Sequence, residues 1–168
     1  MSQKGRRYSL KSKEAKPVLS QASERLKINL ENIVGSKTNI EVAESEQIRI
    51  FLIDGRPVLF KAGETVLPTL LFKEILEKVP KIVVDMGAVP YVCKGADVMA
   101  PGIVRIDGNF SQGDIVVVVD EKHGKLLGLG ESLLDSEAAR IAKQGAVVKN
   151  YHFVSDKVWN FAKVLMKD

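Results

Sequence analysis

The chain has 168 residues, of which 45% are hydrophobic and 27% charged, and this apolar content is enough to bury a core in one mid-sized domain or two small ones. No apolar run approaches the ~20 residues that span a bilayer, and glycine and proline are not in excess, so membrane, collagen-like and wholly disordered classes are excluded. The net charge is +4, and it is concentrated at the start, where residues 1–27 hold eight Lys or Arg and two Glu.

This basic segment is a candidate for contact with an acidic partner. Clustered cations bind phosphates, although a basic helix face in contact only with solvent is at least as common. We name Lys11, Lys13 and Lys16 as candidates for positioning phosphates. The first ten residues have no apolar stretch after their positive charges, so we expect no secretory signal.

Cysteine and histidine are scarce. Cys93 is alone, so no internal disulfide forms, and His123 and His152 are too few for a Cys/His metal cluster. The apolar stretch before Cys93 indicates a buried, inert thiol; His123 is expected in an exposed turn, and His152 as a structural histidine or a surface contact. We therefore expect a reducing, cytoplasmic compartment, with no catalytic residue, no metal and no cofactor.

The first half of the chain shows mixed periodicity. Apolar residues recur with a helical period over 12–26, and Pro17 leaves open whether the helix starts there or has an irregular first turn. From residue 39 the period becomes two, and Asp54-Gly55 between two such runs predicts a hairpin. Residues 68–77 are predicted as a short helix that ends before Pro80. This half is therefore predicted to be α+β.

The second half consists of short Val/Ile-rich runs separated by glycines, which is typical of a small barrel or sandwich. One late helix is expected to begin near Asp135, to bury Ala138, Ile141 and Ala142, and to end at Gly145. The predicted strands are 82–84, 103–106, 115–119, 126–129 and 146–153. The predicted division is an α+β domain at 1–79, a barrel at 80–159 and a C-terminal tail at 160–168.

Glycine and alanine are concentrated between residues 85 and 102, where small side chains would let a phosphate or sugar approach the main chain, with Lys94 adding a charge. The alternative is that these glycines only form the tight turns of a barrel. The segment lacks the endings of a phosphate-binding P-loop and of a dinucleotide fingerprint.

Four segments in the second half, VDMGAVPYVCKGADVMAPGI, FSQGDIVVVV, GKLLGLGESL and NYHFVSDKVW, resemble the PUA domain of pseudouridine synthases and archaeosine transglycosylases. The first half, with its basic start and Asp-Gly hairpin, is similar to archaeal relatives of the multiple-copies-in-T-cell-malignancies proteins and to the N-terminal part of ligatin. The resemblance implies a C-terminal PUA-type β pseudo-barrel with short helices, behind the α+β domain.

The same resemblance implies an RNA-binding surface around the first glycine loop. Asp97 would either contact RNA or cap a local turn, and Met99 would offer a soft surface to a base. The residues so implicated are Gly87, Ala88, Lys94, Gly95, Ala96, Asp97, Val98, Met99, Pro101 and Gly102, flanked by Gly128, Leu129 and Gly130.

We therefore expect a non-enzymatic RNA-binding protein that acts in translation, with no membrane contact. Its expected partners are RNA, as the tRNA 3′ end or rRNA, the small ribosomal subunit, and a separate initiation-factor-one-like protein. Two alternatives remain: an accessory RNA-recognition subunit of an RNA-modifying enzyme, and a protein–protein adaptor. The first 79 residues contain no Cys or His and are too few for the catalytic domains of such enzymes. Residues 80–159 carry nine basic and ten acidic residues, so binding should depend on shape rather than on general attraction to polyanions.

Overall fold

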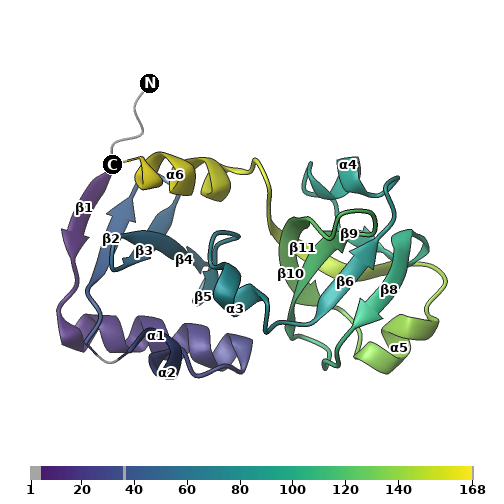
Figure 1. Cartoon of the computed structure of the whole chain (residues 1–168), viewed down its shortest axis with the longest axis horizontal. Coiled ribbons are helices and arrows are strands. Elements are labelled where there is room, and N and C mark those ends of the chain that lie inside the picture. Colours follow the sequence, from purple (N-terminus) through teal and green to yellow (C-terminus); the bar gives the residue numbers. More distant parts are fainter. Residues whose placement is uncertain (1–4, 36, 168) are drawn as a thin grey trace. The chain divides into compact units, whose positions relative to one another are not determined.

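The computed structural model describes residues 5–35 and 37–167, which form two compact units (Figure 1). The N-terminal unit comprises Met1–Phe72 together with Lys157–Asp168, and the C-terminal unit comprises Lys73–Asp156.

The N-terminal unit is an antiparallel sheet with strand order β1-β2-β3-β4-β5. Its strands are β1 (Arg6–Ser9), β2 (Ile40–Glu44), β3 (Arg49–Ile53), β4 (Arg56–Ala62) and β5 (Thr65–Pro68), and its helices are α1 (Ser12–Leu26), α2 (Glu31–Val34) and α6 (Lys157–Met166). Helix α1 packs against β5 and α6 against β4. Successive residues of a strand point to opposite faces, and the buried run Ile50–Phe51–Leu52 therefore shows that both faces of the sheet are covered.

Local sequence signals explain much of this unit. Helix α1 buries Leu19, Ala22 and Leu26, as its period predicted. Pro17 lies inside the helix, which begins five residues earlier, so the interpretation in which the helix starts at Pro17 is wrong. The Asp54-Gly55 hairpin is confirmed: both residues have positive φ, 50° and 84°, as a two-residue turn of the primed type requires.

The helix predicted over 68–77 is wrong in its first half, because Pro68 and Thr69 hydrogen-bond along β4 and residues 70–72 form a turn. Residues Thr65–Pro68 form β5, and only Lys73–Leu76 are helical, as α3. The buried Thr69 fixes this arrangement, since its backbone N–H donates to the Val58 carbonyl at 2.8 Å and its hydroxyl donates to the Pro57 carbonyl at 2.8 Å.

The C-terminal unit is a six-stranded sheet with order β7-β11-β10-β9-β6-β8, in which only β6 and β9 pair in parallel. Its strands are β6 (Lys81–Val84), β7 (Val98–Met99), β8 (Ile103–Asp107), β9 (Ile115–Asp120), β10 (Leu126–Ser132) and β11 (Ala146–Phe153). Short helices α4 (Val89–Val92) and α5 (Ser136–Ile141) and the 3-10 turn η1 (Ala100–Gly102) join them. The curled sheet encloses an apolar core that includes Ile82, Val116, Val118 and Val147. The predicted pseudo-barrel is confirmed.

Two expectations about the chain after β10 need correction. Ile141 is 78% exposed, whereas Ala139 is the residue of α5 that is buried in the core. Gly145 does not end the helix, because α5 stops at Ile141; its φ of +87° instead serves the turn before β11, where its carbonyl accepts the Ala100 N–H at 2.8 Å.

The segment predicted as a tail at 160–168 is largely helical, and this part of the prediction is wrong. Helix α6 (Lys157–Met166) buries Phe161, Ala162 and Leu165 in the N-terminal unit, which explains why the segment is held. Over the described residues, no helix combines the length and the apolar character that crossing a membrane requires.

Candidate nucleic-acid interface

The segment that joins β6 to β8 is held at both of its ends. The Asp85 N–H donates to the Gly102 carbonyl at 2.9 Å, so the start and the end of the segment lie together. The Ala88 N–H, just before α4, donates both to the Asp85 carboxylate at 2.9 Å and to the Asp85 backbone carbonyl at 3.1 Å. The segment therefore has a defined shape.

Asn150 on β11 fixes the middle of this segment. Its side-chain amide donates to the Val92 carbonyl at 3.1 Å and to the Ala96 carbonyl at 3.0 Å, one at each end of the stretch 93–97. Its backbone N–H donates to the Asp97 carboxylate at 3.0 Å. We call residues 93–97 the Asn150-held connection. The Asp97 carboxylate therefore accepts a hydrogen bond from the neighbouring strand β11 and does not cap a turn of its own.

Gly95 in this connection is required for packing. Its φ is +96°, a conformation that side chains rarely adopt, and a Cβ there would lie 3.0 Å from the Phe153 ring. Gly102 is also tightly placed, since its Cβ would lie 3.1 Å from that of Ala88. These two glycines therefore favour the structural alternative stated above, whereas Gly87 is exposed and open.

Several large side chains in or next to the Asn150-held connection are exposed. Tyr91 on α4 is 67% exposed, Met99 on β7 is 49% exposed and Met86 before α4 is 43% exposed. The Tyr91 ring can stack with a base, and the methionine thioethers offer bases a soft contact surface. We define the α4 face as Met86, Tyr91, Lys94, Ala96, Met99 and Pro101, all exposed.

The cysteine and the two histidines differ in their environments. His152 is fully buried and its Nδ1 lies 2.8 Å from the Asp156 carboxylate, so it is a structural histidine. Burial raises the pKa of the half-buried Cys93 thiol, which keeps it protonated. His123 lies in an exposed turn, as predicted. Among residues 5–35 and 37–167, no group of three or more His, Cys, Asp or Glu could hold a metal ion.

Comparison with known proteins supports this architecture. The PUA domain family matches residues 80–154, and a domain of unknown function, DUF1947, matches residues 6–78. An uncharacterized protein of Methanocaldococcus jannaschii is 39% identical over 159 residues, which cover 93% of this chain and 96% of that protein. The crystal structure of a hypothetical protein from Pyrococcus horikoshii superposes with a TM-score of 0.78 at 30% identity, covering 94% of this chain and 99% of that one. The chain belongs to the PUA-domain proteins.

Two further relatives carry functional names. Translation machinery-associated protein 20 of Saccharomyces cerevisiae is 27% identical over 141 residues, which cover 79% of this chain and 78% of that protein. A probable tRNA pseudouridine synthase B of Pyrobaculum arsenaticum is 45% identical over 80 residues, which are 48% of this chain but only 24% of the synthase. The resemblance stated from the sequence motifs is therefore confirmed for both halves of the chain.

The PUA domain does not bring all the predicted site residues to its surface. Lys94, Ala96, Met99 and Pro101 belong to the α4 face, and Gly87 and Asp97 are exposed beside it. Val98, Gly128, Leu129 and Gly130 are buried, so their side chains and Cα atoms are covered by protein. The partly buried residues are Ala88, Gly95 and Gly102.

Met86 and Tyr91 were missed as site candidates. In the sequence they stand within a largely apolar stretch, and such residues are usually buried. Pro90 signals that a helix begins there, but no sequence signal indicates that Met86 and Tyr91 are exposed.

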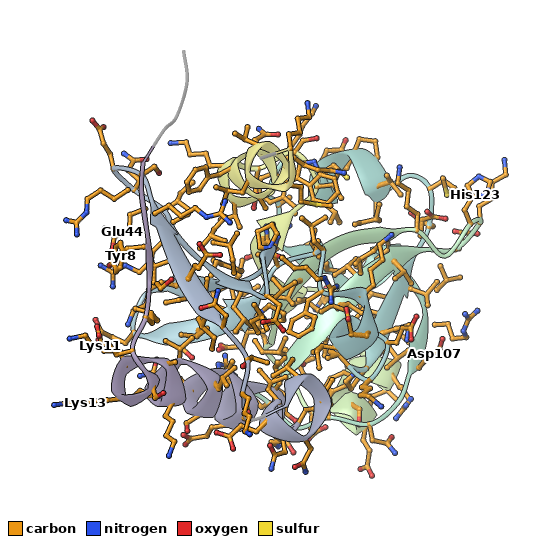
Figure 2. All side chains as sticks on the ribbon, turned by 60° about the vertical axis from the view of Figure 1, so that its left-hand side comes forward. Tyr8, Lys11, Lys13, Glu44, Asp107 and His123 are labelled. Carbon is orange, nitrogen blue, oxygen red and sulfur yellow. The ribbon has the colours of Figure 1, made fainter. Side chains whose placement is uncertain are left out.

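The basic residues near the N-terminus differ in how they are engaged. Arg7 makes two hydrogen bonds to the Glu41 carboxylate, at 3.1 and 3.2 Å, and is neutralised there. Tyr8 donates to Glu44 at 2.9 Å, and this hydrogen bond raises the pKa of Tyr8 (Figure 2). Lys11, Lys13 and Lys16 are exposed at the start of α1, and Figure 2 shows Lys11 and Lys13 extending outward.

Proposed function

We propose that this protein binds RNA in translation, with the 3′ end of a tRNA docking on the α4 face of its PUA domain. The observation that carries the proposal is the α4 face itself, where Tyr91, Met99 and Lys94 are exposed around a connection that Asn150 holds in shape. Two large apolar side chains offer stacking surfaces for unpaired bases and the lysine offers a charge for a phosphate. The homology to translation machinery-associated protein 20 supports a role in translation.

The proposal extends to the partners. We propose contact with the small ribosomal subunit and with a separate protein that carries an initiation-factor-one-like domain. The N-terminal unit would supply part of that contact, because Lys11, Lys13 and Lys16 form an exposed group of cations on one helix end. Neither the buried His152 nor the protonated Cys93 offers a nucleophile or a general base, which supports a binding protein rather than an enzyme.

The test of the α4 face is a substitution that adds a repulsive charge where the base would lie. Met99→Glu should weaken binding of tRNA with an intact CCA end by about tenfold or more, because a carboxylate there repels the phosphates. It should weaken binding of tRNA without the CCA end much less, since that RNA places no bases on the face. Filter binding with both RNAs measures the two losses.

The matched control is Val164→Glu, which introduces the same charge at a residue of α6 with nearly the same exposure, 48% against 49%. We expect it to leave the preference for the CCA end unchanged. Equal losses for both RNAs in Met99→Glu would remove the α4 face from the 3′ end site. Absence of tRNA binding by the unmodified protein would contradict the whole proposal.

A second prediction concerns the lysines of α1, which lie where cations are unfavourable for the helix. The N-terminus of a helix carries a partial positive charge, and Lys11 at the N-cap position makes no capping hydrogen bond with its side chain. Replacing Lys11, Lys13 and Lys16 together by Gln should therefore raise the free energy of unfolding, by about 1 kcal/mol at low salt. The same triple variant should bind all RNAs more weakly and with a smaller salt dependence. Urea unfolding and filter binding at three salt concentrations measure both effects.

A triple variant that is more stable yet binds RNA with the wild-type salt dependence would show that these lysines are only a solvated helix face. Higher stability together with weaker RNA binding would identify the lysines as functional. RNA binding would then explain why the chain carries charges that reduce its stability.

One alternative function has a specific observation behind it. The PUA half is 45% identical to that of a probable tRNA pseudouridine synthase B, so the protein could serve as an RNA-recognition subunit for a modifying enzyme. Sequencing the RNA and identifying the proteins that co-purify with the full chain distinguishes the two. Ribosomal proteins favour the proposed role, a modifying enzyme favours the alternative, and protein without RNA favours an adaptor.

A further inference from the structure

The turn between β9 and β10 leaves the sheet at the same end as α4. Strands β6 and β9 are parallel, with Val84 opposite Asp120, so the segments that follow them emerge side by side. The Glu121 N–H donates to the Val84 carbonyl at 2.9 Å, directly before the turn that leads into α4. The start of β10 also approaches α4, since a Cβ on Gly128 would lie 3.6 Å from the Val92 side chain. We call residues 121–125 the β9–β10 tip; Figure 2 shows His123 at its outer end.

A buried carboxylate holds the tip in one shape. Asp120 is 4% exposed, and its two oxygens accept the N–H of His123 at 2.5 Å and the N–H of Lys125 at 3.2 Å. These backbone hydrogen bonds lower the pKa of Asp120, so it is ionised at neutral pH. Gly124, with φ +63°, completes the turn by donating to the Asp120 carbonyl at 3.1 Å. The tip is thus preorganised rather than a loose loop.

The lysines of the tip are left available. Lys122 and Lys125 are exposed, and within the described part of the chain neither forms an ion pair. The tip that carries them follows β9 at the end of the sheet where the segment leading into α4 follows β6. Two arginines of this unit are engaged instead: Arg105 with Asp107 at 2.8 Å, and Arg140 with the Gly108 carbonyl at 2.6 Å.

The acidic groups of this region do not cancel these lysines by pairing with them. The carboxylates of Asp85, Asp97 and Asp120 each accept backbone N–H groups, while Glu121 is an exposed acid within the tip itself. This end of the PUA domain is therefore not basic in net charge, since Lys94, Lys122 and Lys125 stand against four carboxylates. What distinguishes Lys122 and Lys125 is that both are exposed on a turn of fixed shape.

We propose that the β9–β10 tip is a second RNA contact, in which Lys122 and Lys125 bind backbone phosphates of the strand whose 3′ end docks on the α4 face. The inference rests on the proposed function and adds to it a separate group of residues. It assigns phosphate binding to the tip and recognition of the end to the α4 face, because lysine is a flexible point charge that suits phosphates without reading bases.

The test is the double variant Lys122→Gln with Lys125→Gln, assayed against tRNA with and without its CCA end. We expect the affinity for both RNAs to fall to a similar degree, about tenfold near physiological salt, and the slope of log affinity against log salt to decrease by roughly 0.7 to 0.9 per lost contact. Both residues are exposed, and the N–H groups that Asp120 accepts belong to the backbone, so the variant should unfold at the same urea concentration as the wild type.

The matched control is Lys78→Gln with Lys81→Gln, which removes the same charge at the opposite end of β6. We expect it to leave the salt slope unchanged. If the wild-type protein binds tRNA but the tip variant keeps the wild-type slope, or if the control lowers the slope as much as the tip variant does, the tip is not a contact while the proposed function stands. If the wild-type protein binds no tRNA, both fail.

Discussion

Gly130→Ala should lower the free energy of unfolding by about 3 kcal/mol, the upper part of the range for inserting an extra carbon into a packed interior. A Cβ at this position would lie 2.2 Å from the Lys149 carbonyl oxygen and 2.7 Å from the Val148 side chain. The carbonyl belongs to β11, which shifts register against β10 next to Gly130, so relief requires that two paired strands separate. Urea unfolding followed by fluorescence or circular dichroism measures the loss.

Two other glycines of the PUA domain provide graded controls for this prediction. At Gly128 the nearest atom to a Cβ is the His152 carbonyl oxygen at 3.1 Å, so Gly128→Ala should cost clearly less than Gly130→Ala. At Gly87 the nearest atom is an Asp85 carboxylate oxygen at 3.4 Å, an ordinary contact, and Gly87→Ala should have almost no effect. Equal stability of all three variants would show that the close approach of β11 to β10 is not the reason why residue 130 is a glycine.

The three glycines also show where sequence reasoning reaches its limit. The sequence predicts close approach of the backbone at Gly87, and the resemblance implies that Gly128 and Gly130 flank an RNA-binding surface. In the structure Gly87 is open, whereas Gly128 and Gly130 are the closely approached positions. What approaches them is another strand, however, which leaves no space for a ligand at these positions. A glycine that admits a ligand and a glycine that admits a strand have the same sequence signature, because both need only the absence of a side chain.

The fold was predictable wherever a local pattern decides it. The period of α1, the Asp-Gly hairpin and the glycine-separated strands depend on neighbours within a few residues, and all of them are found in the structure. The segment 68–71 was not predictable in this way, because its helical composition is overruled by pairing with β4 and by the buried hydrogen bonds of Thr69. Helix α6 carries Phe161 and Leu165 at helical spacing, but the sheet that buries them lies more than ninety residues earlier in the chain.

The sequence predicts which segment forms the candidate site, but it does not predict the residue that holds this segment in shape. Motifs place the residues between β6 and β8 on the site, whereas the residue that shapes them, Asn150, follows Val92 by 58 positions and Ala96 by 54. Its neighbours in sequence give no sign of this, since an asparagine in a strand is usually only a polar residue at its surface. Long-range side-chain hydrogen bonds of this kind require coordinates.

The side-chain hydrogen bonds of Asn150 lead to the prediction with the largest expected effect on function. Asn150→Ala should reduce the stability of the protein by about 1 to 3 kcal/mol, because the Ala96 carbonyl loses its donor and the Val92 carbonyl keeps only the Gly95 N–H. It should also weaken the binding of tRNA with an intact CCA end by about tenfold, although Asn150 itself lies beneath the α4 face. The reason is entropic: without the amide, residues 93–97 have several conformations available, and binding must then select one of them. The measurements are urea unfolding and filter binding, the latter at a temperature where the variant is fully folded.

The control for Asn150→Ala is Asn109→Ala, which removes one exposed hydrogen bond from Arg140 at 3.2 Å and should change neither quantity by much. A less stable Asn150→Ala that binds tRNA as tightly as the wild type would show that the Asn150-held connection is not part of the site, since its shape would then be irrelevant to RNA. A variant of unchanged stability would show that the two hydrogen bonds are readily replaced by water. Loss of both stability and CCA-dependent binding is expected, because the same two hydrogen bonds that fasten β11 to the connection also give the α4 face its shape.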